Sequence, residues 1–314
     1  MMGRLKNESG FALILTLVVT ALMVAVLVEM IHQVYVDTSI SRGFRDGQQA
    51  SILAESGVMA VKTALSKNID PALLSNFLAK PLSDEVGSLE IKISDESGKI
   101  NINGLVDGQD NYDPPTQNTL LRLISRLKLQ EVPPGDVLDS VADWIDKNDG
   151  PSSKGAETPY YRTMKPAYSA RNDKLMTLIE LTLVKGITPA MLDGLVDEKE
   201  KLKLRDCLTI YSNQQNFVIN VNSASKAVLM ALDPGISESV ADQIINKRPF
   251  NGVGEFSKVT ELDNVYRNSG SWGSRLTTTS SLFRVTAVAK VKESVRIVEA
   301  VVSNGSFLSW QEYW

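Results

Sequence analysis

Three aspartates are spaced so that their carboxylates would lie along one side of a helix. Asp139, Asp143 and Asp146 are separated by four and then three residues. Like charges at these spacings are neighbours on a helix surface, and each such pair destabilises the helix by about 0.2–0.5 kcal/mol. We therefore expect a compensating feature near these side chains, and a bound cation would supply one.

The segment after these aspartates adds further oxygen ligands. Asn148, Asp149 and Glu157 follow within a loop that the turn residues Gly150-Pro151 interrupt. Calcium takes about six to eight oxygen ligands in irregular geometry, whereas zinc and copper favour His or Cys, and this segment has neither. An EF-hand does not fit, because Gly150-Pro151 replaces its fifth-position ligand and its sixth-position glycine. Two interpretations stay open, a calcium site and a solvated acidic surface whose aspartates close turns.

Other catalytic patterns are absent from the sequence, which has no Gly-rich phosphate loop and no G-x-S-x-G motif. The one histidine, His32, borders the N-terminal apolar run, so a Ser or Cys triad cannot be assembled in the rest of the chain. Clustered carboxylates act as acid and base in glycosidases, but the helical spacing and turns here favour a binding or structural role. We predict that the protein is not an enzyme.

The N-terminal residues predict a membrane anchor. A short leader with Arg4 and Lys6 precedes the stretch from Ser9 to Val28, which has no charged residue before Glu29. A helix of about 20 apolar residues crosses the ~30 Å hydrocarbon core of a bilayer. Because positive residues stay on the cytoplasmic side, we expect a single-pass protein of the inner membrane with a cytoplasmic N-terminus and a periplasmic body.

A small residue lies before this apolar run rather than after it. Gly10 is followed by Phe11, and no Ala-x-Ala-like cleavage site follows Val28, as a secretory signal would require. Cleavage after Gly10 would leave the whole apolar segment as the mature N-terminus. This order resembles the leader of type IV pilins and pseudopilins, which a membrane peptidase cleaves after Gly before it N-methylates the new terminal Phe. The alternative is an uncleaved signal anchor.

Leu15 departs from the pilin pattern. It is the fifth residue counted from Phe11, where most pilins and pseudopilins carry a glutamate. A carboxylate at membrane depth costs about 3 kcal/mol, so it is retained only for a task. In pilins that task is to pair with the N-terminal amine of a neighbouring subunit, and in the resembling systems the subunit without the glutamate sits at the fibre tip. The alternative is a lipid-facing residue of an ordinary anchor.

The composition predicts a tethered protein with a folded body. The 314 residues are 43% hydrophobic and 22% charged, which suffices for a core in two or three domains. A sequence pI near 5.3 argues against a general nucleic-acid surface, which needs clustered Lys and Arg. The single cysteine, Cys207, excludes an intrachain disulfide, so the stability of a periplasmic body would come from packing and from a metal.

Helical and strand patterns flank a long middle segment. An apolar helical period continues from Ile31 to Leu65, and alternating residues predict strands at 88–94 and 99–103, joined by a turn as a hairpin. Further strands are predicted at 282–288 and 294–302. One long helix on an antiparallel sheet, interrupted by a helical insertion, gives an α+β, pilin-like fold.

The middle segment contains two helical units. Helices are predicted at 117–127, 136–145, 175–184 and 189–195, and then in a second unit up to Leu232 and from Ser237 to Lys247. Ser223 or Ser225 would cap the first helix of that second unit, and Ser237 the second helix. Both units resemble helix-hairpin-helix, or SAM-like, domains.

The second unit also has a DNA-binding interpretation. Its Pro234-Gly235 turn leads into a helix N-terminus that could hold a phosphate, and residues 220–256 resemble the DNA-receptor domains of competence systems. However, Asp233 and Glu238 flank the turn and would repel a phosphate. We therefore expect no nucleic-acid partner, and a membrane-tethered DNA receptor of a competence or type IV pilus system stays the alternative.

Four longer motifs identify a family. They are DWIDKND from Asp143, GAETPYY from Gly155, ARNDKLMTLIELTLVKGIT from Ala170 and INVNSASKAVL from Ile219. Together with Leu15 they resemble the minor pseudopilin K of type II secretion systems. The resemblance implies a tip subunit that joins minor pseudopilins I, J and H, helps to initiate the pseudopilus and supports protein export. It also implies a prepilin peptidase and an inner-membrane secretion platform as partners.

The same resemblance implies residue roles and boundaries. Calcium would be bound by Asp143, Asp146, Asp149 and Glu157, and the disulfide found in some relatives is missing because the chain has one cysteine. The expected units are a prepilin leader at 1–10, the transmembrane and stalk helix at 11–65, the first part of the sheet at 66–103, SAM-like domains at 104–216 and 217–278, and C-terminal strands at 279–314.

Overall fold

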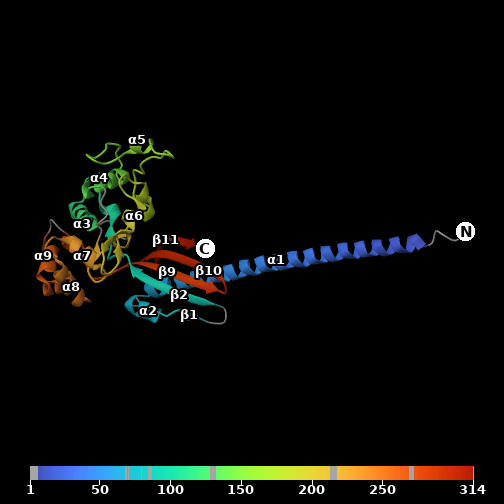
Figure 1. Cartoon of the computed structure of the whole chain (residues 1–314). Helices are drawn as coiled ribbons and strands as arrows, with labels where there is room; N and C mark the ends of the chain where they lie inside the picture. Colours follow the sequence, from blue (N-terminus) through green and yellow to red (C-terminus); the bar gives the residue numbers. More distant parts are fainter. Residues whose placement is uncertain are drawn as a thin grey trace.

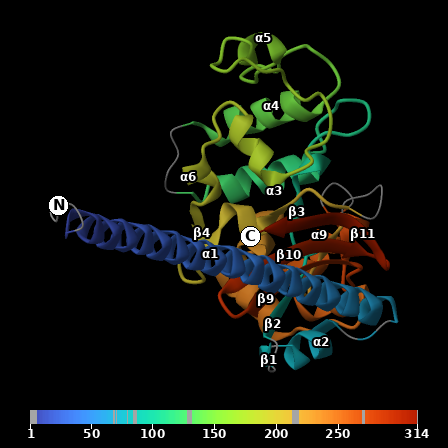
Figure 2. The same cartoon turned by 90° about the vertical axis from the view of Figure 1, so that its right-hand side faces the viewer.

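The chain forms a long helix, an antiparallel sheet and a helical head, which we define as residues 96–281 (Figure 1). The structure is a computed structural model that describes residues 6–67, 69, 71–78, 80–83, 87–127, 132–212, 218–268 and 272–313. The sheet lies along the C-terminal part of the helix, and the head lies beyond the sheet, at the end away from the N-terminus (Figures 1 and 2). The predicted α+β, pilin-like class is confirmed.

Helix α1 (Lys6–Ser66) is continuous over 61 residues but changes its surroundings along its length. Every residue from Gly10 to Arg45 is exposed, whereas Ala50, Ala54 and Val58 are fully buried against the sheet. These residues recur at steps of four, so they form one apolar stripe. The N-terminal part of α1 therefore protrudes from the body, and its C-terminal part belongs to the core.

The sheet has five antiparallel strands in the order β1-β2-β9-β10-β11. Small residues of β9, such as Ala287 and Ala289, are fully buried beneath α1 and let the helix approach closely. Gly57 of α1 does the same for β2, because a Cβ there would lie 3.0 Å from the Ile91 side chain. The strands are β1 (Leu82–Ser83), β2 (Ser88–Asp95), β9 (Leu282–Val291), β10 (Ser294–Ser303) and β11 (Ser306–Tyr313), and the short helix α2 (Pro71–Phe77) leads from α1 to β1.

The predicted hairpin of 88–94 with 99–103 is wrong. Strand β3 (Ile100–Asn101) pairs in parallel with β6 (Leu208–Thr209) inside the head, while β2 pairs with β1 and β9. Ile100 and Ile102 are buried in the core of the head, so their alternation reflects that core rather than the sheet. The first part of the sheet thus ends at β2.

The head has one continuous hydrophobic core that runs from Ile100 to Leu276, and both predicted helical units contribute to it. Ser225 and Ser237 cap α7 and α8 by accepting hydrogen bonds from backbone N–H groups, as the sequence predicts. The segment 178–183 is a 3-10 helix rather than an α-helix. The helices are α3 (Pro114–Ile124), α4 (Pro134–Ile145), α5 (Thr158–Tyr161), α6 (Pro189–Leu192), α7 (Lys226–Leu232), α8 (Glu238–Asn246) and α9 (Thr260–Arg267); the short strands are β4 (Leu195–Asp197), β5 (Leu202–Lys203), β7 (Ile219–Asn220) and β8 (Leu276–Thr277).

A buried ion-pair network joins the head to the sheet. Glu96 is fully buried and accepts hydrogen bonds from Lys99 and Thr209 of the head and from Arg284 of β9. Arg284 also pairs with Glu299 of β10 at 2.5 Å. Although burial raises the pKa of Glu96, its hydrogen bond with Arg284 and the charges of Lys99 and Arg284 bring the net pKa below its usual value. The charged form of Glu96 therefore links the head to β9.

Candidate metal centre and membrane helix

Three buried carboxylates converge where α4 ends and α5 begins. One oxygen each from Asp143, Asp146 and Glu157 lies within 4.8 Å of the others. Asp143 belongs to the last turn of α4, Asp146 is its C-terminal cap residue, and Glu157 precedes α5 as its N-terminal cap residue. The helical period places the two aspartates on one side of α4, and the loop of residues 147–156 returns the chain so that Glu157 faces them.

Several oxygens of this cluster have no hydrogen-bond partner. They are Oδ1 of Asp146 and both carboxylate oxygens of Glu157, although both residues are buried. Asp143 accepts hydrogen bonds from the Ser152 N–H at 3.0 and 3.1 Å. Among the described residues, no Lys or Arg forms an ion pair with these three carboxylates. Buried polar atoms nearly always have a partner, so these oxygens fit ligands of a cation.

The electrostatics of the cluster agree with this interpretation. Burial, and then the negative charges of neighbouring carboxylates such as Asp143, raise the pKa of Asp146 to about 6 and that of Glu157 to about 7. Without a cation, the folded protein thus holds these groups together at a cost. A divalent cation would supply the opposite charge, and an all-oxygen donor set is what calcium prefers.

The loop around the cluster is held tightly. A Cβ placed on Gly155 would lie 1.9 Å from Oδ2 of Asp143, so only glycine fits here. Asp139, which the sequence places on the same side of the helix, lies outside the group of three. Its carboxylate accepts hydrogen bonds from the Tyr112 hydroxyl at 2.7 Å and from the Lys154 N–H at 3.1 Å. Asp139 therefore anchors the loop.

Asp149 is exposed and lies outside the group of three, where it accepts a hydrogen bond from the Asn172 amide at 3.0 Å. Asn172 has a left-handed backbone with a φ of 50°, and its side-chain Oδ1 is buried without a partner. Its N–H donates to the Trp144 carbonyl near the end of α4. Asn172 thus links Asp149 to the end of α4, and the sequence prediction did not include it because only the fold brings it to α4.

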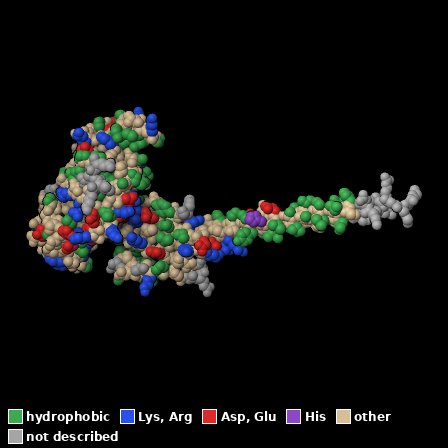
Figure 3. Space-filling view, viewed as in Figure 1, with side chains coloured by type: hydrophobic (Ala, Val, Ile, Leu, Met, Phe, Trp, Pro, Cys, Tyr) green, Lys and Arg blue, Asp and Glu red, His purple; other side chains and the backbone are tan. Residues whose placement is uncertain are grey.

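Helix α1 is the one helix in the described part of the chain that is long and apolar enough to cross a membrane. Figure 3 shows hydrophobic side chains along the part that protrudes from the body. The hydroxyls of Thr16 and Thr20 donate to backbone carbonyls three residues earlier, so their polar atoms are satisfied within the helix. Gly10, Phe11 and Leu15 all lie exposed in this apolar part.

The lysines near the start of α8, as the structure describes them, are paired with carboxylates. Lys226 pairs with Glu238 at 3.1 Å and with Asp242 at 2.7 Å, and Lys199 pairs with Glu238 at 2.7 Å. In the turn, Asp233 accepts a hydrogen bond from the Gly235 N–H, which places a carboxylate where a phosphate would approach. This charge distribution favours a scaffold over a DNA-binding surface.

Comparisons with known proteins agree with this arrangement. Two family models described as type II secretion system (T2SS), protein K match residues 98–196 and 219–272. The type II secretion system protein K of Pseudomonas aeruginosa is 27% identical over 275 residues, which cover 82% of this chain and 78% of that protein. This chain belongs to the type II secretion system protein K family.

Further relatives extend the match over the protein K chain. The type II secretion system protein K of Aeromonas hydrophila is 24% identical over 96% of this chain and 94% of that protein. A crystal structure of the GspK-GspI-GspJ complex from the enterotoxigenic Escherichia coli type 2 secretion system contains a chain with the same fold, at a TM-score of 0.67 and 19% identity. The similarity covers 88% of this chain and 99% of that chain. The predicted assignment to the minor pseudopilins of type II secretion is confirmed.

Proposed function

We propose that this chain is the tip subunit of the type II secretion pseudopilus, which joins minor pseudopilins I, J and H, initiates the fibre and supports protein export. The position of the head carries this proposal. The head lies at the end of the molecule opposite the N-terminus of α1 (Figure 1). In a fibre whose subunits align their N-terminal helices, a further subunit above this one would have to occupy the volume of the head.

Leu15, an uncharged residue in the apolar part of α1, also supports a location at the fibre tip. We expect a prepilin peptidase to cleave after Gly10 and N-methylate Phe11, which makes Leu15 the fifth residue of the mature chain. A leucine cannot neutralise the terminal amine of an adjacent subunit. A tip subunit has no subunit above it whose amine requires this partner.

The exposed apolar residues of α1 indicate where partner subunits pack. Ile31, Tyr35, Ile40 and Phe44 lie beyond the predicted bilayer span, and each is at least 65% exposed. In water such a row of side chains is unfavourable, and burial gains about 25 cal/mol per Å² of apolar area. Helices of minor pseudopilins I, J and H would cover these residues, and the inner-membrane secretion platform would lift the bundle outward.

We propose that calcium stabilises the head. Asp143, Asp146 and Glu157 would hold the ion, and Asp149, Asn172 and water would complete the site. When bound, the ion supplies the positive charge that the cluster lacks. Its role is structural, because it would lock the loop of residues 147–156 between α4 and α5 in the position seen here.

Co-expression tests the assembly. The full chain, extracted from membranes in detergent, is expected to co-purify with minor pseudopilins I and J, and replacement of Ile40 and Phe44 by Ser is expected to weaken this association. The matched control replaces Leu73 and Phe77 of α2, which are similarly exposed but lie off α1. Failure to co-purify, combined with salt-dependent duplex DNA binding by the same preparation, would instead favour the DNA-receptor alternative.

A further inference from the structure

In the described part of the chain, the last strand of the sheet, β11, has one edge that pairs with no other strand. Among the described residues, β11 pairs only with β10, whereas the opposite edge of the sheet is the two-residue strand β1. Natural sheets protect their edges with Lys or Pro residues or with very short edge strands, because an open edge readily pairs with another strand. The sequence of β11, SFLSWQEY, has no Lys, Arg or Pro in eight residues.

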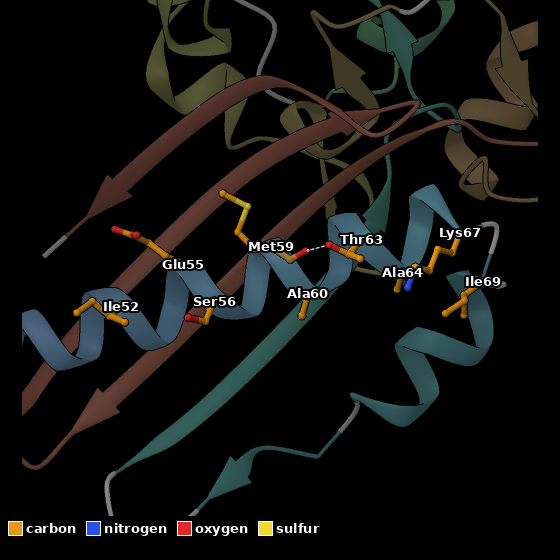
Figure 4. Close-up of a pocket in the computed structure, with 9 residues that line it drawn as sticks. All are labelled: Ile52, Glu55, Ser56, Met59, Ala60, Thr63, Ala64, Lys67 and Ile69. Atoms are coloured by element: carbon orange, nitrogen blue, oxygen red, sulfur yellow. Dashed lines mark hydrogen bonds between the residues drawn. The ribbon is translucent and has the colours of Figure 1, made fainter.

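Apolar side chains lie beside this edge on the face that α1 covers. The pairing of β11 with β10 places Phe307 and Trp310 on the same face as the buried residue Ala300, and their rings pack edge to face at 5.1 Å. Trp310 is 38% exposed, and Met59 of α1 is 49% exposed. Figure 4 shows Met59 and Glu55 on the flank of α1 that faces the C-terminal strands. Phe307 and Trp310 thus form a partly exposed apolar surface between α1 and the edge of β11.

Two carboxylates lie near this surface, whose cation, Lys62 of α1, lies over the Phe307 ring at 4.6 Å. The hydroxyl of Ser51 contacts both Glu55, at 3.4 Å, and Glu312 of β11, at 2.5 Å. No Lys or Arg of the described chain forms an ion pair with either carboxylate. A partner with a basic side chain at this point would complement the charge.

The other face of β11 borders a cleft between the sheet and the head. The cleft has a volume of about 1120 Å³, and its lining includes Gln311 and Tyr313 of β11 together with Ile179 of the head. Figure 3 shows the hollow between these two parts of the molecule. A strand added to β11 would therefore point alternate side chains into this cleft and against Trp310.

We propose that β11 accepts an extended segment of a neighbouring minor pseudopilin as a sixth strand. A strand is the occupant that satisfies a row of free backbone groups, and its main chain would supply affinity while its alternate side chains supply specificity. The segment carries a basic residue opposite Glu55 and Glu312 and an apolar residue against Trp310. The partner class rests on the proposed function, because a subunit packed along α1 is thereby brought beside β11.

Site-specific photo-crosslinking in cells with the complete secretion system tests this inference. The photo-reactive residue benzoylphenylalanine replaces Leu308, the extra residue of the bulge in β11, or Ile40 of α1 as a reference. The Leu308 position is expected to capture a minor pseudopilin through a peptide that contains Lys or Arg. Glu312→Lys is expected to lower this yield by about tenfold, whereas Glu90→Lys on β2 leaves it unchanged. Glu312→Gln retains an acceptor for Ser51, so a reduced yield there reports the lost charge rather than lost folding.

Each alternative outcome has a distinct meaning. Capture of a minor pseudopilin from Ile40 but not from Leu308 overturns the role of β11 and leaves the proposed function intact. Capture from neither position overturns both. Capture of a second copy of this chain from Leu308 also overturns the inference, since the edge then serves self-association.

Discussion

The metal-free head is predicted to lose stability as the pH rises. Asp146 and Glu157 keep their protons in the folded state up to pH values of about 6 and 7, whereas in the unfolded chain they ionise near 3.8 and 4.5. The folded state therefore binds more protons between these limits, and the free energy of unfolding falls as pH rises through them. This is the reverse of the usual behaviour of a carboxylate in an ion pair.

The size of the effect follows from the same shifts. One pKa unit corresponds to about 1.4 kcal/mol, but the two groups repel each other and exposed residues border them, so their contributions do not add. We expect about 2 kcal/mol between pH 5 and pH 8, or a decrease in melting temperature of roughly 5 °C. Calcium at 100 times its Kd would add about 2.7 kcal/mol, and this gain is largest at high pH, where the carboxylates are ionised.

Thermal melts of the detergent-solubilised full chain, followed by circular dichroism with chelator or with calcium, measure both effects. The matched control combines Asp146→Asn with Glu157→Gln, which keeps the shape of the cluster and is expected to remove the pH trend and the calcium response together. A metal-free melting temperature that stays constant or rises from pH 5 to pH 8 would refute the electrostatic reasoning. An unchanged melt on adding calcium would reject the site.

Further predictions concern the loop, the junction and the anchor. Gly155→Ala is expected to lower calcium affinity at least about tenfold in a titration and to destabilise the head by about 1–3 kcal/mol, because the added Cβ would overlap the Asp143 carboxylate. A variant that binds calcium as tightly as the wild type would contradict the tight contact. Glu96→Gln should destabilise the chain by about 3 kcal/mol in denaturant melts, since it leaves the partly buried Arg284 with one carboxylate partner fewer. A change below about 0.5 kcal/mol would argue against the junction. Leu15→Glu is not expected to create a fibre-body subunit, and long fibres that carry this variant internally, seen by immunolabelling, would disprove that expectation.

Local sequence signals predicted the regular parts of the fold well. The periodicity of α4 and the capping serines Ser225 and Ser237 depend on contacts within a few residues, and the structure confirms them. The strand partner of Ile100 could not be predicted from local sequence, because buried strands of the sheet and of the head show the same alternation. C-terminal strands were expected within 279–314, but β11 was not predicted as a separate strand, since the bulge at Leu308 interrupts its alternation.

The acidic cluster shows the same limit for a site. Spacing along α4 predicts that Asp143 and Asp146 are neighbours, but it does not separate them from Asp139, which binds the loop instead. Glu157 reaches the cluster because the loop closes, and Asn172 reaches Trp144 and Asp149 because a distant segment packs against α4. The contacts of Glu157 and Asn172 depend on tertiary structure. The sequence next to each of these residues therefore does not predict them.

The location of this chain in an assembled pseudopilus tests the central claim most directly. Immunogold labelling of the head on pseudopili sheared from cells, viewed by electron microscopy, would report that location. A tip subunit predicts label at one end of each fibre and none along the shaft. Label repeated along the shaft would contradict the proposal, because the head would then have to fit between stacked subunits.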